Sequence, residues 1–334
     1  MAKLALTEVK KLTKDYYNVF QGVYNDFKQV SMSEYKFEME PLVYESFLES
    51  VDGGLIDCYI LLEDNIPTGF LAYTTAISDA LELNIVHCMG TDNLNEKRKI
   101  LISKFLEENQ DLTSKMVVTY PMMGSQRDFV PLLSHLGFKF VNIAVVRFNF
   151  SNEVSVKILD KAYAQSKISG YEIIPWQDSY LEEAASLINK AFEDTADALF
   201  DPRFKTYEGS LDVLQKIVSG FYGEFLPYTM RLALHENKLC GICLANITTG
   251  TIANIPLFGL LKEHRGKGLS KYLLSEVVKN LYDDVQNGKY NLTEINASVE
   301  TDNYAAVKMY RHIGFKEDYS YPQSYLPIKN SDEN

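Results

Sequence analysis

The chain has 334 residues, of which 46% are hydrophobic and 23% are charged, and these ordinary globular values exclude collagen-like, low-complexity and disordered classes. Since one domain takes roughly 150 residues, the length favours two domains. The 45 acidic and 33 basic residues give a net charge of −12. This excess of acid argues against nucleic acid as a partner, because such binding neutralises phosphates with Lys and Arg, and it favours cationic substrates.

The sequence also carries expectations about location. No apolar run approaches the roughly 20 residues of a membrane helix, so we expect no membrane partner. The N-terminal stretch MAKLALTEVKK has charged residues where the core of a signal peptide is apolar. The four cysteines are too few for a disulfide framework. We therefore expect a cytoplasmic protein.

In chain order, the first predicted elements are two strands of a hairpin over Leu61–Tyr73, where a polar turn joins two apolar runs. Alternation over Arg147–Phe150 predicts a strand that ends the first half. A helix is predicted within residues 151–170, with Gly170 as its stop signal. Tyr171–Pro175 then begins the second half as a strand.

The two halves resemble each other. The segment Ala233–Ala245 repeats the hairpin of Leu61–Tyr73 at an offset of 172 residues (237 − 65). The segment Met309–Glu317 repeats Leu132–Phe140 at an offset of 177 residues (314 − 137). Because both halves mix helical and strand patterns, we expect an α/β fold (α+β in some schemes) built from two similar domains.

The segment with the clearest chemical signal runs from Ile252 to the helix that follows it. Ile252–Leu261 is almost continuously apolar, which is typical of a buried strand, and apolar residues from Leu269 onward recur on one helical face. The glycine-rich Arg265–Ser270 lies between them. A strand, a glycine turn and a helix N-terminus can hold a phosphate, because the first helical N–H groups are unpaired. A glycine turn without a ligand is the alternative reading.

The turn does not match the commonest nucleotide motifs. In a Walker loop, Ser or Thr would follow the lysine and a glycine would stand at position 261, but Gly268 follows Lys267 and residue 261 is Leu261. The dinucleotide pattern G-x-G-x-x-G is also absent, because no third glycine closes it.

The turn instead resembles the pyrophosphate loop of the GCN5-related N-acetyltransferases (GNAT), whose pattern is Gln/Arg-x-x-Gly-x-Gly/Ala. Arg265–Ser270 follows this pattern with Ser270 in the last place. A second family pattern, Asn-x-x-Ala-x-x-x-Tyr-x-x-x-Gly-Phe, is matched from Asn303 through Tyr310 to Phe315. The resemblance covers about residues 171–328 and implies two tandem GNAT-like domains, each a mixed central sheet flanked by helices.

The resemblance implies an N-acetyltransferase that takes acetyl-CoA as acyl donor and transfers the acetyl group by direct attack of an amine in a ternary complex. Tyr310 stands at the family's position for the general acid, and packing is its alternative role. The implied cofactor-binding residues are Leu260, Arg265, Gly266, Lys267, Gly268, Leu269, Ser270 and Asn303. The acceptor is expected to be a small-molecule or peptide amine. A different acyl-CoA, and a non-catalytic CoA-binding or interaction module, stay open as alternatives.

The general base is less defined, and Glu294 and Glu300 are both candidates, directly or through water. A cluster of acidic residues in the expected acceptor region favours a cationic amine, with helix capping as its alternative: Glu193, Asp194, Asp197 and Asp201.

The first half is predicted to lack this chemistry. Alignment by the Gly-Phe pairs places Leu133 at the position of Tyr310 and Gln126 at that of Asn303. Alignment by the hairpins places Asn93–Arg98, which contains no glycine, at the position of the phosphate loop. We therefore predict a degenerate GNAT-like domain over residues 1–150, a linker helix over 151–170 and an acetyltransferase domain over 171–334.

No metal site is predicted. Cys240 and Cys243 form a C-x-x-C, but no second ligand pair accompanies them, and in a strand their side chains would point to opposite faces. We expect both to be buried structural residues. His264 adjoins the phosphate loop and is assigned to turn packing, with cofactor contact as the alternative. The sequence leaves monomer and homodimer open.

Overall fold

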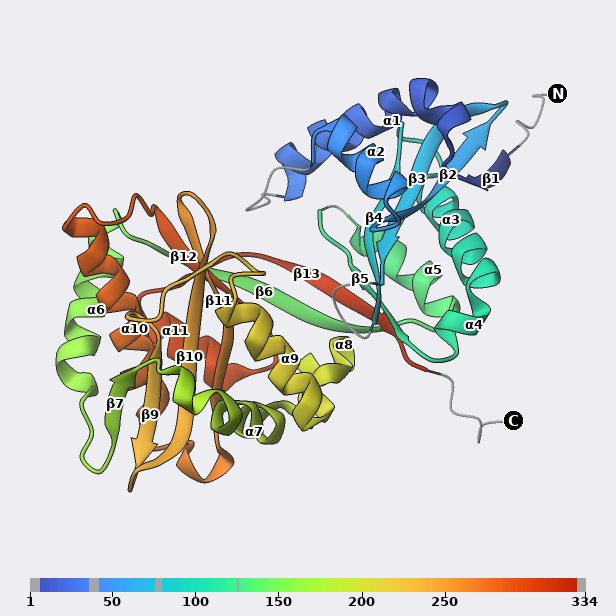
Figure 1. The fold of residues 1–334 in the computed structure, drawn as a ribbon. Helices are drawn as coiled ribbons and strands as arrows, with labels where there is room; N and C mark the ends of the chain where they lie inside the picture. Colours follow the sequence, from blue (N-terminus) through green and yellow to red (C-terminus); the bar gives the residue numbers. More distant parts are fainter. Residues whose placement is uncertain (1–6, 36–41, 76–79, 125, 329–334) are drawn as a thin grey trace. The chain divides into compact units, whose positions relative to one another are not determined.

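A computed structural model describes residues 7–35, 42–75, 80–124 and 126–328 (Figure 1). The chain divides into two compact units, each assembled from separate parts of the sequence. Unit 1 contains residues 1–141, 199–201 and 321–334. Unit 2 contains residues 142–198 and 202–320.

Unit 1 is a mixed sheet with helices on both faces. Its strands are β1 (Thr7–Lys11), β2 (Asp57–Glu63), β3 (Ile66–Thr74), β4 (Ala80–Cys88), β5 (Val117–Pro121) and the end of β13 (Lys316–Leu326), in that spatial order. Neighbouring strands are antiparallel except β4 and β5, which are parallel. The helices are α1 (Tyr17–Val30), α2 (Tyr44–Asp52), α3 (Leu94–Glu108), α4 (Gln110–Thr113) and α5 (Val130–His135).

Two apolar clusters hold the faces of this sheet. The cluster beside α1 and α2 is aromatic, with Phe20 meeting Phe70 edge-on at a centroid distance of 5.2 Å. The cluster beside α3 and α5 contains Phe105 and Leu133, both fully buried. Figure 1 shows α1 and α2 on one side of β2–β4 and α3 on the other. Successive side chains along a strand point to opposite faces of the sheet, and each face is buried against its own layer of helices.

Unit 2 has the same kind of architecture. Its strands are β6 (Lys139–Asn149), β7 (Glu172–Pro175), β8 (Glu224–Phe225), β9 (Arg231–His235), β10 (Lys238–Thr249), β11 (Ile252–Leu260) and β12 (Glu294–Glu300). The spatial order is β13-β6-β12-β11-β10-β9-β7, and β8 pairs with β10. The helices are α6 (Glu153–Ser166), α7 (Leu181–Phe192), α8 (Asp197–Phe200), α9 (Tyr207–Val218), α10 (Leu269–Gln286) and α11 (Tyr304–Ile313). Short 3-10 helices cover Lys14–Tyr16, Arg127–Phe129, Asp178–Tyr180, Pro202–Lys205 and Lys262–His264, and a π-helical turn covers Ser31–Tyr35.

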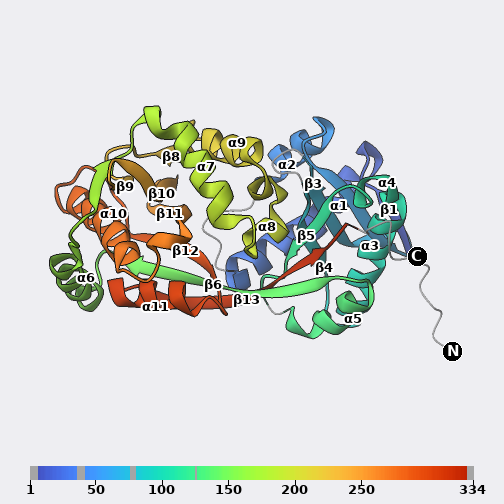
Figure 2. The same ribbon diagram turned by 90° about the horizontal axis from the view of Figure 1, so that it is seen from below.

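The helices of unit 2 lie in two layers, as Figure 2 shows. A Cβ atom at Gly259 would meet Phe192 and Ile188, so α7 covers one face of β11. A Cβ atom at Gly241 would meet Leu273, so α10 covers the opposite face. The predicted helix between the halves, α6, lies beside α10, where Ser275 Oγ donates to Ser166 Oγ at 3.1 Å. Since its Leu159 is fully buried in the same core, α6 is an integral part of unit 2.

The two predicted hairpins are present, and their turns have the same backbone conformation. Asp64 and Asn65 have φ of 50° and 67°, and Glu236 and Asn237 have φ of 51° and 62°. Two consecutive positive φ values define the two-residue turn whose twist matches that of the strands, and Asn tolerates this conformation best. The repeat inferred from the sequence is therefore confirmed at these hairpins.

Both units pair strands that are far apart in the sequence. In unit 2, β6 pairs antiparallel with β12, from Ile143 opposite Glu300 to Asn149 opposite Glu294. In unit 1, the end of β13 pairs antiparallel with β5, from Gln323 opposite Pro121 to Leu326 opposite Val118. The mixed sheets with helices on both faces confirm the predicted α/β class. Among the described residues, no helix has the combination of length and apolar character that crossing a bilayer requires.

Candidate functional site

The strands β11 and β12 of unit 2 start together and then separate. They pair in parallel at three positions only, from Ile252 opposite Glu294 to Asn254 opposite Asn296. A bulge explains the separation: residues 244 and 246 of β10 oppose residues 257 and 254 of β11, so β11 carries one extra residue. A bulge bends its strand and is common beside functional sites. Beyond Asn254, the edge of β11 up to Leu260 has no pairing with β12.

The glycine turn follows directly from the end of β11. Gly266 and Gly268 have φ of +76° and +87°, a conformation that side chains disfavour, and a Cβ at Gly266 would meet no atom within 4 Å. Gly268 is the N-cap of α10, an 18-residue helix, and provides no side-chain cap. Among the residues that the structure describes, the backbone N–H groups of residues 266–270 have no hydrogen-bond acceptor. Converging free N–H groups and the positive end of a helix can bind an anion.

Arg265 has a positioning role that the sequence does not reveal. Its Nε donates to the carbonyl oxygen of Leu260 at 3.1 Å, and its Nη2 donates to that of Ala191 at 3.2 Å. The guanidinium thus connects the end of β11 to the end of α7. Its side chain fixes the start of the turn, while the side chain of Lys267 is exposed and Leu269 is buried in the core.

Tyr310 lies on α11 and is 4% exposed, with its ring edge-on to Phe315 at 5.1 Å between centroids. Its hydroxyl has no hydrogen-bond partner among the described residues. Burial, followed by the charges of Cys243 and Asp197, raises the pKa of Tyr310 far above its usual 10. The phenol therefore keeps its proton throughout the neutral range.

Asn303 is the N-cap of the same helix. Its Oδ1 accepts a hydrogen bond from the N–H of Ala306 at 3.1 Å, as helix caps do. This contact fixes the start of α11 and uses the amide oxygen, whereas the amide NH₂ has no partner in the described part of the chain.

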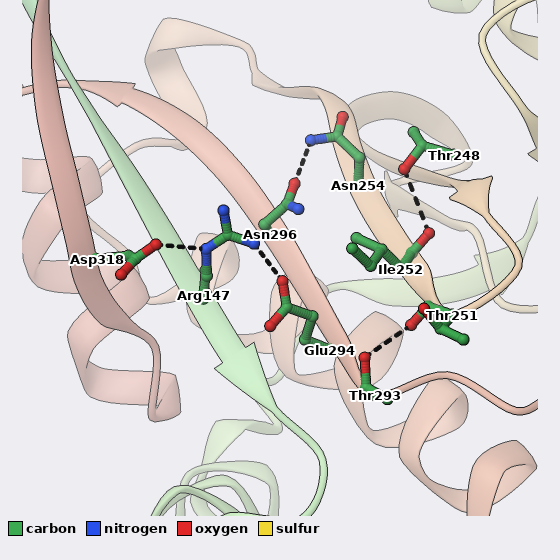
Figure 3. A network of polar contacts seen from close by, with 9 residues as sticks. All are labelled: Arg147, Thr248, Thr251, Ile252, Asn254, Thr293, Glu294, Asn296 and Asp318. Atoms are coloured by element: carbon green, nitrogen blue, oxygen red, sulfur yellow. Dashed lines mark hydrogen bonds and ion pairs between the residues drawn. The ribbon is translucent and has the colours of Figure 1, made fainter. Parts of the chain in front are cut away.

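A row of polar side chains crosses the sheet where β11 and β12 separate (Figure 3). Asn254 donates to Asn296, and Arg147 contacts Glu294 and lies 2.9 Å from Asp318 through Nε. The Nδ2 atom of Asn296 is buried without a hydrogen-bond partner. Such a group costs about 1–3 kcal/mol, so its presence requires an explanation.

Arg147 was missed by the sequence reasoning, because it comes from the half that was assigned no chemistry. It lies on β6, opposite Asn296 of β12. Arg147 and Asn149 alternate with apolar Phe148, so the pattern shows that Arg147 and Asn149 share one face of their strand. It does not show which other strand pairs with that strand.

Most of the other candidates have structural roles. All four cysteines are buried free thiols, as expected for Cys240 and Cys243, and no group of metal ligands occurs in the described residues. The His264 ring packs on Tyr171, whose hydroxyl lies 3.0 Å from Nδ1. Of the acidic cluster, Asp197 is part of unit 2 and Asp201 is part of unit 1.

Unit 1 repeats the backbone of this site with different side chains. Within the described residues, β4 and β5 also pair at three positions only, and β4 carries a bulge between Leu83 and Ile85. The helix starts, Leu94 and Leu269, differ by 175 residues (269 − 94). The counterpart of residues 265–270 is therefore 90–95, not 93–98, and the prediction that it contains no glycine is wrong at Gly90. Asn93, with φ of +56°, takes the place of Gly268.

Residues 188–315 match the sequence model of the Acetyltransferase (GNAT) family. No curated protein sequence matches the chain. Among solved structures, the chain is similar to a GCN5-related N-acetyltransferase from Sphaerobacter thermophilus, with TM-score 0.65 and 16% identity over 97% of this chain and 96% of that one. It is also similar to a tandem GNAT protein from the clavulanic acid biosynthesis pathway, with TM-score 0.57 and 13% identity over 98% and 100%.

A third similar structure is a region described as a glucosamine N-acetyltransferase within a fungal GH3 β-N-acetylglucosaminidase. It has TM-score 0.63 and 13% identity, over 97% of this chain and 38% of that one. At such identities these structures show the fold, and the fold is that of tandem GNAT proteins over nearly the whole chain. The family match indicates an acyltransferase.

Proposed function

We propose that the chain is a GNAT-family enzyme that transfers an acetyl group from acetyl-CoA to an amine acceptor by direct attack in a ternary complex. The observation that carries this proposal is the continuous path from the unpaired edge of β11 into the free N–H groups of residues 266–270. The chemistry of CoA fits both parts. The amide-bearing pantetheine arm needs strand-like partners, and the pyrophosphate needs converging N–H groups.

The cofactor-binding residues fit this ligand in different ways. At Gly266 and Gly268 the backbone can approach a phosphate closely, since neither carries a Cβ. The N–H groups of Lys267, Leu269 and Ser270 complete the cradle. In this proposal Leu260 ends the strand along the pantetheine arm, Arg265 positions the loop, and the free NH₂ of Asn303 contacts the arm.

We assign Tyr310 as the general acid. Attack of the amine nitrogen on the thioester carbonyl forms the C–N bond, and loss of CoA breaks the C–S bond. The leaving thiolate resembles a free thiol with a pKa of about 8.5, and a phenol that holds its proton at neutral pH has that proton available to donate as the C–S bond breaks. A buried, neutral Tyr310 hydroxyl with no partner in the part of the chain that the structure describes supports this role.

Direct attack is favoured over an acyl-enzyme. Covalent catalysis through cysteine requires a thiolate, which forms at a depressed pKa. Burial raises the pKa of the Cys240 thiol to about 11 and that of Cys243 further. Neither thiol is therefore a nucleophile. The four free thiols also support our proposal of a reducing, cytoplasmic location.

The test is calorimetric titration with acetyl-CoA, followed by a thiol-release assay with a panel of amines that includes glucosamine, a polyamine and a lysine peptide. Gly268→Glu should abolish acetyl-CoA binding, because its carboxylate would lie among the N–H groups of the loop. Gly288→Glu is the matched control, since Gly288 has φ of +72°, open space around it and a place beyond the opposite end of α10.

The outcomes separate the alternatives. Binding without turnover on any amine would favour a CoA-binding module. Turnover with a longer acyl-CoA but not with acetyl-CoA would favour a different acyl donor. Equal affinity of Gly268→Glu and wild type would show that the loop is not the pyrophosphate site.

A further inference from the structure

One face of β12 carries a polar strip that starts at Asn296, the last residue paired with β11, and continues past the point where β11 separates. Asn296, Ser298 and Glu300 alternate along the strand with buried Ile295, Ala297 and Val299. Asn296 is 1% exposed, Ser298 is exposed and Glu300 is partly buried. Successive side chains on one face of a strand are about 6.6 Å apart, so the strip extends over about 13 Å.

Asn296 Oδ1 accepts a hydrogen bond from Asn254, but the other polar groups of the strip have no partner in the described part of the protein. The Nδ2 atom of Asn296 is a buried donor with no acceptor. The Ser298 hydroxyl and the Glu300 carboxylate form no hydrogen bond or ion pair with described residues. Glu294, on the same face of the same strand, differs because it contacts Arg147. The strip therefore offers a donor amide, a hydroxyl and a carboxylate to a ligand, while Glu294 is already engaged.

Glu300 and Tyr310 share a charged neighbour. The Asp197 carboxylate raises the pKa of both groups, and burial is the larger cause in each case. For Glu300, Asp302 adds to the effect. Glu300 ends β12 and Tyr310 lies on α11, and the N–H of Asn303, the N-cap of α11, donates to the Glu300 carbonyl oxygen at 3.0 Å.

We propose that Asn296, Ser298 and Glu300 form the acceptor site, that Glu300 takes the proton of the acceptor ammonium, and that the acceptor is an amine with hydroxyl or carbonyl oxygens along its length. Asn296 Nδ2 and Ser298 Oγ donate to these oxygens, which distinguishes such an amine from a simple alkylamine. This inference rests on the proposed acetyl transfer. It also chooses Glu300 over Glu294 as general base.

The proton transfers balance. The ammonium gives one proton to Glu300, which later releases it to solvent, and the neutral amine forms the C–N bond. The nitrogen then loses a second proton, which restores the phenol of Tyr310 after that phenol has protonated the CoA thiolate. The products are the N-acetyl amine, CoA with a free thiol, and one proton in solution.

The test compares Glu300→Gln with Glu294→Gln, the same change on the same face of the same strand. In the wild type, kcat/KM should fall in acid as Glu300 becomes protonated, at a pH above the ordinary carboxyl value of 4.5. Glu300→Gln should lose this acidic limb and about 10²-fold in kcat. Glu294→Gln should keep the limb. Affinity for acetyl-CoA, measured by calorimetry, should be unchanged in Glu300→Gln.

Acceptor selectivity provides a second readout. Asn296→Ala should raise KM for glucosamine about tenfold and leave KM for hexylamine nearly unchanged. Ser298→Ala, at an exposed position, tests the same strip if Asn296→Ala fails to fold. An acidic limb that persists in Glu300→Gln, or an unchanged KM ratio in both strip variants, would overturn the inference while acetyl transfer stands. A wild-type protein that binds no acetyl-CoA would overturn the proposed function and this inference with it.

Discussion

The hydroxyl of Tyr310 is the atom whose removal separates catalysis from structure most cleanly. Tyr310→Phe keeps the buried ring and its edge-on contact with Phe315. Because the hydroxyl has no hydrogen-bond partner among the described residues, its loss leaves no orphaned group there, and the free energy of unfolding should change by less than about 1 kcal/mol. A general acid contributes about 10²–10⁴-fold, so kcat should fall by that factor, equivalent to about 2.7–5.4 kcal/mol in the barrier.

The assay is release of free CoA thiol at saturating amine, with acetyl-CoA affinity measured separately by calorimetry. Tyr304→Phe is the matched control, because Tyr304 starts the same helix and is 76% exposed. The control should keep wild-type kcat, and both variants should bind acetyl-CoA as the wild type does. Wild-type turnover in Tyr310→Phe would refute the assignment of the acid. A fall of several kcal/mol in stability would instead show that the hydroxyl has a structural partner.

Two further predictions concern the scaffold of the site. Arg265→Met should lower the free energy of unfolding by about 1–3 kcal/mol, because it removes the hydrogen bonds to Leu260 and Ala191; denaturant unfolding that matches wild type would contradict this role. Gly314→Ala should destabilise by about 2 kcal/mol or more, since φ is +108° and a Cβ would lie 2.7 Å from the Ser155 carbonyl oxygen. Gly288→Ala, which meets open space at φ of +72°, should cost less in the same thermal or chemical unfolding measurement. Equal losses would show that the Ser155 contact does not matter.

Local features of this fold could be predicted from the sequence because they depend on neighbouring residues. The Asp64-Asn65 turn, the apolar strand from Ile252 and the glycine turn before α10 each follow from periodicity and backbone preference. The pairings between strands far apart in the sequence could not be predicted. Ser324 donates to the carbonyl of Tyr120 across a separation of 204 residues, and strand alternation specifies a face rather than a partner.

The site divides in the same way. The motifs locate Gly268, Asn303 and Tyr310, since their spacing is local to one helix start or one helix. Arg147 and the unpaired amide of Asn296 depend on which strands become neighbours, and the separation of β11 from β12 depends on one extra residue. The sequence alignment placed the unit 1 counterpart of the glycine turn three residues too late in the chain. That alignment used the offset between the hairpins, which does not include insertions between each hairpin and the following helix.

The number of acetyl-CoA sites per chain tests whether side chains or backbone decide which unit binds. Unit 1 keeps the bulge, the separating strands and a glycine in the turn, so backbone shape alone would allow a second site. Its turn nevertheless has Asp92 where unit 2 has Lys267, and Asn93 where unit 2 has Gly268. A carboxylate in the cradle repels pyrophosphate. A Cβ atom at the N-cap also keeps the pyrophosphate away from the backbone N–H groups. Calorimetry should therefore give one site, which Gly268→Glu removes; two sites, or one that survives this substitution, would show that the backbone of unit 1 is sufficient.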